Sequence, residues 1–377
     1  MPAGSEIDVL YAAGAAPHGD LDWFDAHTHI GQNDPDGMTA TADEILAGLD
    51  ASGHRRALTF AMHEPDGYRD ANDVVLRACA ASGGRLLPLA RIAPGSPGAL
   101  DEARRCLDAG ALGFKLHPRS DAFALTHPDV EAVVALVAER RGPVLFHAGR
   151  GIPQLGEAAV RLAERYPDAR LILAHAAVSD LGTLAEAAAR LPNLLFDTAW
   201  WHPADILQLY ATIPPGNVLY ASDMPYGPGQ FTAFASLRCA AAVGLGTDVF
   251  REIAGGQLAR LLAGEDPLDL GPAPGAAAIG PRTLELERVA SYACVAAQLS
   301  FHGQDPSEAI ALARSAAQTR DTGPTGELLG MIDLLLGRAL GQVDVGAERP
   351  SLRAVGAVMA AAFLATTPSA GIPDVVL

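Results

Sequence analysis

Two histidines two residues apart, His27 and His29, are the first residues in the chain whose type and spacing suggest chemistry. They follow the apolar run Leu21–Phe24, which predicts a β-strand, and Gly31 ends that strand. Because side chains alternate between the two faces of a strand, both imidazoles point the same way. Two neutral imidazoles held close together suit a divalent transition metal such as zinc. An isolated pair of this kind is more often structural, so the choice between a metal site and two ordinary strand-end histidines depends on the rest of the sequence.

Five further polar residues stand at the ends of later apolar runs. They are Lys115 and His117 in the fourth run, His147 in the fifth, His175 in the sixth and Asp223 in the eighth. In a parallel β/α barrel the carboxyl ends of all strands meet at one rim, where active sites lie. Burying each of these groups without a shared partner would cost roughly a few kcal/mol. Together they predict a metal site at such a rim.

The elements that would position these residues follow a regular order. Eight short runs rich in Leu, Val, Ile and Phe alternate with Ala-rich segments of helical spacing across residues 21–265. This order predicts a (β/α)8 TIM barrel of the α/β class. A doubly wound open sheet is the alternative, but no G-x-G-x-x-G motif follows the first run. Thr41 and Glu44 form a capping-box pattern that predicts the start of a helix.

The segments on either side of the barrel differ from it in composition. Residues 1–20 lack periodicity and are expected to form a loose or lightly packed N-terminal extension. Residues 266–281 are dense in Pro, Gly and Ala, which is typical of a linker. Residues 282–377 show three or four amphipathic helical patterns and predict a small all-helical C-terminal domain. Its Ala-rich faces would allow these helices to form a homodimer, cap the barrel rim or contact another protein.

Composition excludes several classes of partner. The formal net charge of −17 leaves no basic surface for nucleic acid. The longest apolar run, Ala354–Ala365, is shorter than the roughly 20 residues that a membrane span needs. The four cysteines include no C-x-x-C pair, and the N-terminus has no cationic leader region. We therefore expect a cytoplasmic protein whose partner is a small-molecule substrate.

Several motifs together resemble the amidohydrolase superfamily of metal-dependent barrel enzymes. The similarity is greatest to its branch of small hydrolases and decarboxylases related to aminocarboxymuconate-semialdehyde decarboxylase. The motifs are Asp25–His29, Gly113–Pro118, Phe146–Gly149, Leu173–His175 and Ala221–Gly227. The resemblance covers residues 21–265 and leaves out the helical tail.

This resemblance implies a metal centre and roles for its residues. By it, His27, His29, His147 and Asp223 bind one divalent metal ion, with Zn²⁺ expected first and Mn²⁺ as the alternative. His175 is then the acid/base residue or the group that polarises the substrate, and Asp223 serves as a ligand or as the general base that accepts the proton of the bound water. A free Lys115 would act on the substrate, whereas a carbamylated Lys115 would bridge to a second metal ion.

The remaining polar and aromatic residues near the predicted rim indicate the kind of substrate. Lys115, His117 and Arg150 favour an anionic, carboxylated molecule, and Trp200 and Tyr226 would give the pocket aromatic walls. The expected function is a metal-dependent hydrolase in which metal-bound hydroxide attacks an ester, lactone or amide carbonyl. The alternative is a nonoxidative, metal-dependent decarboxylase of an aromatic or unsaturated carboxylic acid. A non-enzymatic scaffold is disfavoured because no ligand position is missing.

Overall fold

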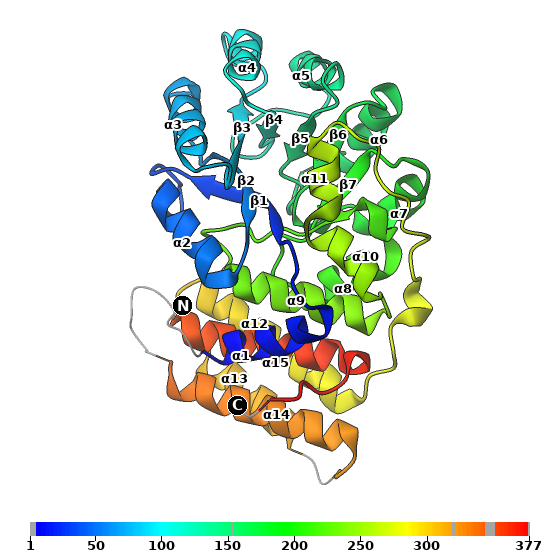
Figure 1. Ribbon diagram of the computed structural model, residues 1–377. Coiled ribbons are helices and arrows are strands. Elements are labelled where there is room, and N and C mark those ends of the chain that lie inside the picture. The colour runs from blue at the N-terminus through cyan, green and yellow to red at the C-terminus, as the bar shows by residue number, and fades with distance from the viewer. Residues whose placement is uncertain (1–4, 153, 319–320, 344–350, 376–377) are drawn as a thin grey trace.

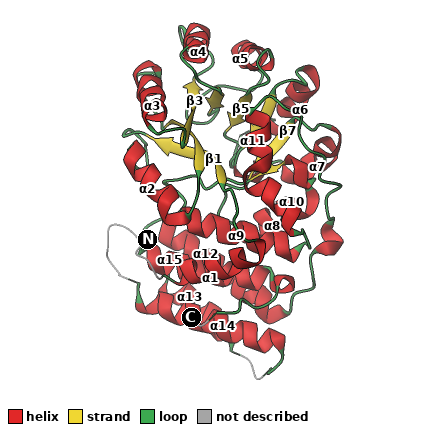
Figure 2. Cartoon of the chain, viewed as in Figure 1, coloured by secondary structure: helices red, strands yellow, loops and turns green. Residues whose placement is uncertain are grey.

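A computed structural model describes residues 5–152, 154–318, 321–343 and 351–375, and in it eight parallel strands form one sheet in chain order (Figures 1 and 2). The strands are β1 (Phe24–Ile30), β2 (Arg56–Ala61), β3 (Leu86–Ile92), β4 (Gly113–Leu116), β5 (Pro143–Phe146), β6 (Arg170–Leu173), β7 (Leu194–Asp197) and β8 (Val218–Leu219). The segment from β8 onward returns to β1, where the N–H of Ala26 donates to the carbonyl of Tyr220 at 3.0 Å. The sheet is therefore a nearly closed barrel, which confirms the predicted TIM barrel.

Helices alternate with the strands and cover the outside of the barrel. They are α2 (Ala42–Ser52), α3 (Arg69–Ala81), α4 (Ala99–Asp108), α5 (Pro128–Ala138), α6 (Leu155–Arg165), α7 (Leu181–Arg190), α8 (Pro203–Thr212), α9 (Gly229–Ala242), α10 (Thr247–Arg251) and α11 (Gln257–Leu262). The predicted capping box opens α2, since Thr41 Oγ1 accepts the N–H of Glu44 at 3.2 Å and the Glu44 carboxylate accepts the N–H of Thr41 at 2.8 Å. Strands packed between helices and the barrel interior are buried on both faces, which explains their continuous apolar runs.

The first and last strands differ from their predicted extents. β1 begins only at Phe24, later than the apolar run Leu21–Phe24, and contains His27 and His29 near its carboxyl end, as the sequence predicts. β8 contains two residues, and the chain then turns at Asp223, whose φ of 65° is left-handed. This turn brings Asp223 back to β1, where the backbone N–H of Asp223 donates to the carbonyl of His27 at 3.0 Å.

The expectation of a loosely packed N-terminal extension is wrong for the described part of that segment. Helix α1 (Glu6–Ala15) begins with a capping box in which Ser5 and Asp8 exchange side chain to backbone hydrogen bonds. Ile7 and Leu10 are each only 1% exposed, and the helix packs against α9 and α15. Residues 1–4 lie outside the described residues. Two buried residues on this ten-residue helix are therefore sufficient to dock the segment against the rest of the protein.

The predicted all-helical appendage follows the barrel. It contains α12 (Leu284–Phe301), α13 (Ser307–Ala317), α14 (Pro324–Gly341) and α15 (Leu352–Thr366). Figure 1 shows these helices stacked below α8 and α9, beside α1. The buried Arg238 guanidinium of α9 donates to the carbonyl of Thr367 at 2.6 Å and to that of Gly371 at 2.7 Å, which joins the two parts. Within the described ranges, no helix has both the length and the apolar character of a membrane span.

Candidate active site

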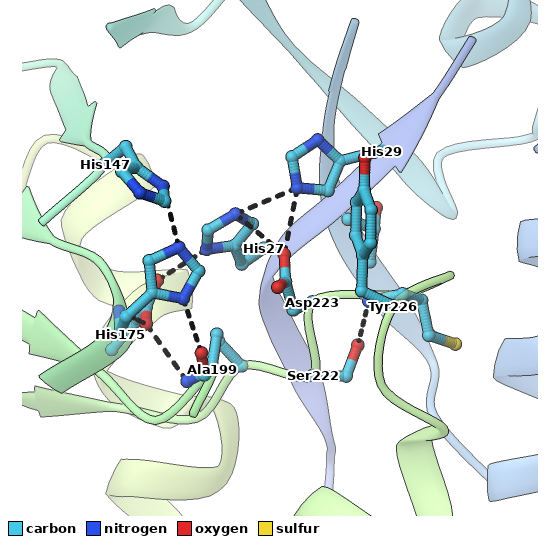
Figure 3. A network of polar contacts seen from close by, with 12 residues as sticks. His27, His29, His147, His175, Ala199, Ser222, Asp223 and Tyr226 are labelled. Atoms are coloured by element: carbon cyan, nitrogen blue, oxygen red, sulfur yellow. Dashed lines mark hydrogen bonds and ion pairs between the residues drawn. The ribbon is translucent and has the colours of Figure 1, made fainter. Parts of the chain in front are cut away.

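Three of the predicted metal ligands meet at the carboxyl end of the barrel (Figure 3). Nε2 of His27 and Nε2 of His29 lie 3.1 Å apart, and Oδ1 of Asp223 lies 3.2 Å from the first and 2.9 Å from the second. Their ligand atoms all lie within 4.8 Å of one another. β1 places both imidazoles on one face, as their spacing predicts, and the turn after β8 supplies the carboxylate.

The chemistry of these three side chains fits a divalent metal ion. Burial and the neighbouring Lys115 lower the pKa of His27 and of His29 well below 6.5, so both imidazoles are neutral, the form that binds metal. Two nitrogen ligands of one tetrahedral zinc ion lie about 3.3 Å apart, because each Zn–N bond is about 2.0–2.1 Å long. The observed separations of 2.9–3.2 Å are close to that value.

A buried carboxylate that the sequence analysis did not single out, Asp197 at the end of β7, orients this group. Its Oδ2 accepts Nδ1–H of His27 at 2.8 Å, and its Oδ1 accepts the backbone N–H groups of His175 and Ala199 at 2.8 and 3.0 Å. Because His27 carries its proton on Nδ1, Nε2 presents a lone pair to the other ligands. Burial raises the pKa of Asp197 to about 7, whereas the two N–H groups and Lys115 favour its ionised form. The sequence feature that could have identified Asp197 as a site residue is its position at the end of a predicted strand.

His147 and His175 form a second group beside the first. Nδ1–H of His175 donates to the carbonyl of Ala199 at 2.6 Å, so Nε2 of His175 accepts Nδ1–H of His147 at 2.9 Å. The ring of His147 also stacks on His117, with centroids 3.8 Å apart. The structure thus places His147 beside the predicted acid/base residue rather than within the three-residue ligand group. Its role as a metal ligand through the remaining Nε2 stays a prediction.

Two of these residues hold a backbone conformation that non-glycine residues rarely adopt. The φ angles of His175 and Asp223 are 58° and 65°, both in the left-handed region. Such a conformation costs roughly 1–3 kcal/mol and is concentrated at functional sites. At both positions this backbone conformation aims the side chain at the ligand group. Gly149 leaves space for the ring of His147, because a Cβ on Gly149 would lie 2.8 Å from Nε2 of His147.

Lys115 of β4 is fully buried next to the ligand group. Its Nζ lies 3.3 Å from Nε2 of His27 and 4.7 Å from the ring centroid of Phe60. Burial lowers its pKa to about 7, although Asp223 and Asp197 raise it. Lys115 does not line the cavity described next, so contact with a substrate remains a prediction, as does its carbamylation.

A cavity of about 730 Å³ adjoins these residues, a volume typical of small-molecule sites. We call His27, His29, His147, His175 and Asp223 the polar floor, and all of these except His27 line the cavity. The other predicted substrate-binding residues line it as well; they are His117, Arg150, Trp200 and Tyr226. The structure thus brings together the predicted ligand, acid/base and substrate residues around one cavity. Lys115 is buried next to the ligand group and does not line the cavity.

The aromatic and cationic residues lie close to the polar floor. The Arg150 guanidinium carbon is 5.6 Å from the ring centroid of Trp200, whose Nε1–H donates to Asp205 at 2.7 Å. The ring of Tyr226 meets His29 edge-on at 5.2 Å, and its hydroxyl donates to Asp34 at 2.6 Å. These contacts hold both rings as walls of the cavity.

Sequence reasoning did not single out two further groups of lining residues, although capping of the rim by the C-terminal helices was one of its alternatives. Arg91 of β3 reaches the cavity with a buried guanidinium, which donates to Asp121 at 3.1 Å. The second contribution comes from the C-terminal helices, and together with Trp201 we call it the apolar wall; it consists of Trp201, Phe301, Leu352, Val355 and Met359. Neither has a local motif, because both depend on which elements pack over the rim.

Comparison with known proteins places this barrel in a family. A family profile described as amidohydrolase matches residues 24–262, which is more than half of the chain. No curated protein sequence matches the chain. The matched range includes every residue of the polar floor and ends before α12.

Solved structures share the barrel at low sequence identity. 5-Carboxyvanillate decarboxylase from Sphingomonas paucimobilis is 17% identical with a TM-score of 0.51, over 65% of this chain and 99% of that one. 2,6-Dihydroxybenzoate decarboxylase from Rhizobium is 17% identical with a TM-score of 0.50, over 64% of this chain and 98% of that one. An uncharacterised TIM-barrel protein from Bordetella bronchiseptica has the same identity of 17% and a TM-score of 0.51, over 59% and 83%. At such identities the likeness establishes the fold alone.

Proposed function

Because the chain belongs to the amidohydrolase family, we propose that it is a metal-dependent hydrolase acting on the ester, lactone or amide carbonyl of a small, carboxylated substrate. The observation that carries this proposal is the convergence of His27, His29 and Asp223 on one point at the floor of a cavity. A divalent metal ion held there would polarise a carbonyl and lower the pKa of a bound water to about 7. The first expectation is Zn²⁺.

Asp223 is suited to accept the proton of the attacking water. Its side chain is 22% exposed, so the carboxylate reaches the cavity as well as the two histidines. Burial raises its pKa to about 6, against the lowering effect of His175 and Lys115, so it is mostly ionised at neutral pH and still a useful base. In the hydrolysis, the water oxygen bonds to the carbonyl carbon, the bond to the leaving group breaks, and the proton passes through Asp223 to that group.

His175 is suited to exchange a proton with the substrate through Nε2, which must take up a proton before it can donate one. Its Nδ1–H is fixed on the carbonyl of Ala199, which sets the ring orientation and leaves Nε2 towards His147 and the cavity. Burial lowers its pKa, so the ring is neutral when a substrate enters. Arg150 offers a cation for the substrate carboxylate, and Trp200 offers a ring face beside it.

The second candidate is a nonoxidative decarboxylase of an aromatic or unsaturated acid. It is favoured by the ring faces of Trp200 and Tyr226, which would hold a flat substrate between the cavity walls. In that reaction the bond from ring carbon to carboxylate breaks, CO₂ leaves and a proton takes its place on the carbon. His175 would deliver that proton from Nε2 after taking it up from solvent, because its Nδ1–H is held by the carbonyl of Ala199.

Metal content and product analysis test both candidates. We would measure metal per chain by elemental mass spectrometry on protein purified without chelator or added metal. The metal-loaded protein would then be assayed on esters and lactones for acid release, and on hydroxybenzoates for CO₂ release. Acid release that disappears after chelation supports the hydrolase, and CO₂ release alone replaces it with the decarboxylase. A content near one fits the ligand group alone, whereas two would indicate a carbamylated Lys115 bridge.

A further inference from the structure

Two chemically different groups of residues line the cavity. The polar floor supplies imidazole and carboxylate groups, whereas α12 and α15 supply only apolar side chains and backbone. In the apolar wall, Leu352 is 66% exposed and Phe301 is 49% exposed, although both are large hydrophobic residues. An exposed apolar surface that lines a cavity beside a reactive centre marks a ligand-binding surface.

The apolar wall is fixed against the barrel by packing. The rings of Phe301 and Trp201 meet edge-on, with centroids 5.4 Å apart and an interplanar angle of 76°. Further along α15, Phe363 packs edge-on against Phe231 of α9 at 5.6 Å. Met359, on the same helix, is only 2% exposed and still reaches the cavity. α12 and α15 are thus integral parts of the pocket.

We propose that this wall selects the substrate: it binds an apolar acyl or aryl group attached to the carbonyl that the polar floor holds. The inference rests on the proposed function, because it assumes that the reacting group lies at the floor. The cavity of about 730 Å³ exceeds what a carboxyl or lactone group alone would fill, and Trp201, Leu352, Val355 and Met359 are among the residues that line it. All wall residues except Trp201 lie outside residues 24–262, so most of the selecting surface belongs to the appendage.

The expected signature is a dependence of binding on chain length. Each methylene moved from water onto an apolar surface improves affinity by about fourfold. Straight-chain carboxylates from acetate to decanoate should therefore bind the metal-loaded protein with stepwise lower Kd values until the cavity is full. A parallel series from benzoate to phenylbutanoate distinguishes an aryl from an alkyl preference.

Calorimetry on three variants tests the assignment. Val355→Trp fills the space beside the wall, and Leu352→Ser makes an exposed part of it polar without disturbing a packed core. Leu334→Trp is the matched control, since Leu334 of α14 is 45% exposed and does not line the cavity. In the first two variants we expect the affinity for octanoate to fall at least tenfold, so that affinity no longer rises with chain length. In the control the rise with chain length should persist.

The outcomes separate this inference from the proposed function. A Kd that is independent of chain length, or that is unchanged in both wall variants, would overturn the assignment of the wall. Chain-length-dependent binding without hydrolysis of the matching p-nitrophenyl esters would overturn the hydrolase and retain the wall. Ester hydrolysis whose kcat/KM rises with acyl length only in the wild type and the control would support both.

Discussion

The polar floor and the apolar wall face the same cavity but are built in different ways. Every residue of the floor lies in a barrel strand or in the loop that follows one, where buried hydrogen bonds such as that between His27 and Asp197 fix its orientation. Apart from Trp201, the wall comes from helices far along the chain, positioned by apolar packing and by the Arg238 contacts. The difference suggests that reactivity and substrate choice reside in separable parts. Changes in one part should then leave the other unaffected.

The largest effect should come from Asp223→Asn, which keeps the shape of the side chain but removes its charge and its capacity as a base. We expect kcat/KM for an ester substrate to fall about a thousandfold, within the range for a lost general base. The affinity series for alkanoates should keep its chain-length dependence, because the wall is intact. Asp248→Asn is the control, since that side chain is 98% exposed. Activity within tenfold of the wild type would show that Asp223 is not the general base.

Arg238→Met should destabilise the protein by about 3 kcal/mol, since it removes hydrogen bonds from a charged donor and leaves the buried carbonyl of Thr367 without this donor. Urea unfolding measures this loss, and Arg77→Met on the exposed face of α3 serves as the control. Metal content should remain that of the wild type, because the floor does not depend on this contact. If metal binding fell together with stability, floor and wall would be one unit.

His54 tests whether acid sensitivity belongs to the polar floor or simply to burial. Burial lowers the pKa of His54 to about 3, and its ring packs between Trp23 and Tyr220, away from the cavity. The unfolded chain binds this proton near pH 6.5 and the folded chain does not, so stability falls as the pH drops. Between pH 6 and pH 4 this one group accounts for roughly 2.5 kcal/mol of lost stability.

His54→Leu should therefore flatten the pH dependence of the unfolding free energy by about that amount. Chemical unfolding at pH 6 and pH 4 measures it, with the exposed His302→Leu as the matched control. An unchanged slope would assign the acid sensitivity to the floor histidines instead.

The barrel and most of the floor could be predicted from the sequence because their signals are local. Each strand is a continuous apolar run, and each rim residue directly ends such a run, so order alone places His27, His147 and His175 at one edge. The resemblance to a family then suggested roles. What remained open was which ring nitrogen faces which partner, because that depends on contacts such as His175 to Ala199.

The parts that could not be predicted depend on contacts between distant segments. Asp197 resembles an ordinary strand-end carboxylate until it meets His27, 170 positions away in the sequence. The wall residues have no motif, since Leu352 and Phe301 become pocket residues only through the packing of their helices over the rim. Helix α1 was missed although Ser5 and Asp8 form a capping box, because its short apolar face gains stability from α9 and α15 rather than from its own sequence.

The smallest and most specific effect should come from Asp197→Asn, which changes a proton position rather than a ligand. Asn Oδ1 would still accept the N–H groups of His175 and Ala199, so its NH₂ group would face Nδ1 of His27. That nitrogen would then have to accept, and the proton would move to Nε2, where the lone pair for the metal is lost. Metal affinity should fall about 10- to 100-fold, as for other partners that orient ligand imidazoles.

Competition with a metal chelator at pH 8, where Asp197 is ionised in the wild type, measures that loss, and ¹⁵N chemical shifts of the metal-free protein report the tautomer of His27 directly. Asp248→Asn again provides an exposed carboxylate for comparison. A variant with weaker metal binding but an unchanged His27 tautomer would mean that the negative charge, not the proton position, is what Asp197 contributes. Chain-length-dependent binding of alkanoates should survive in either case, because the apolar wall makes no contact with this hydrogen bond.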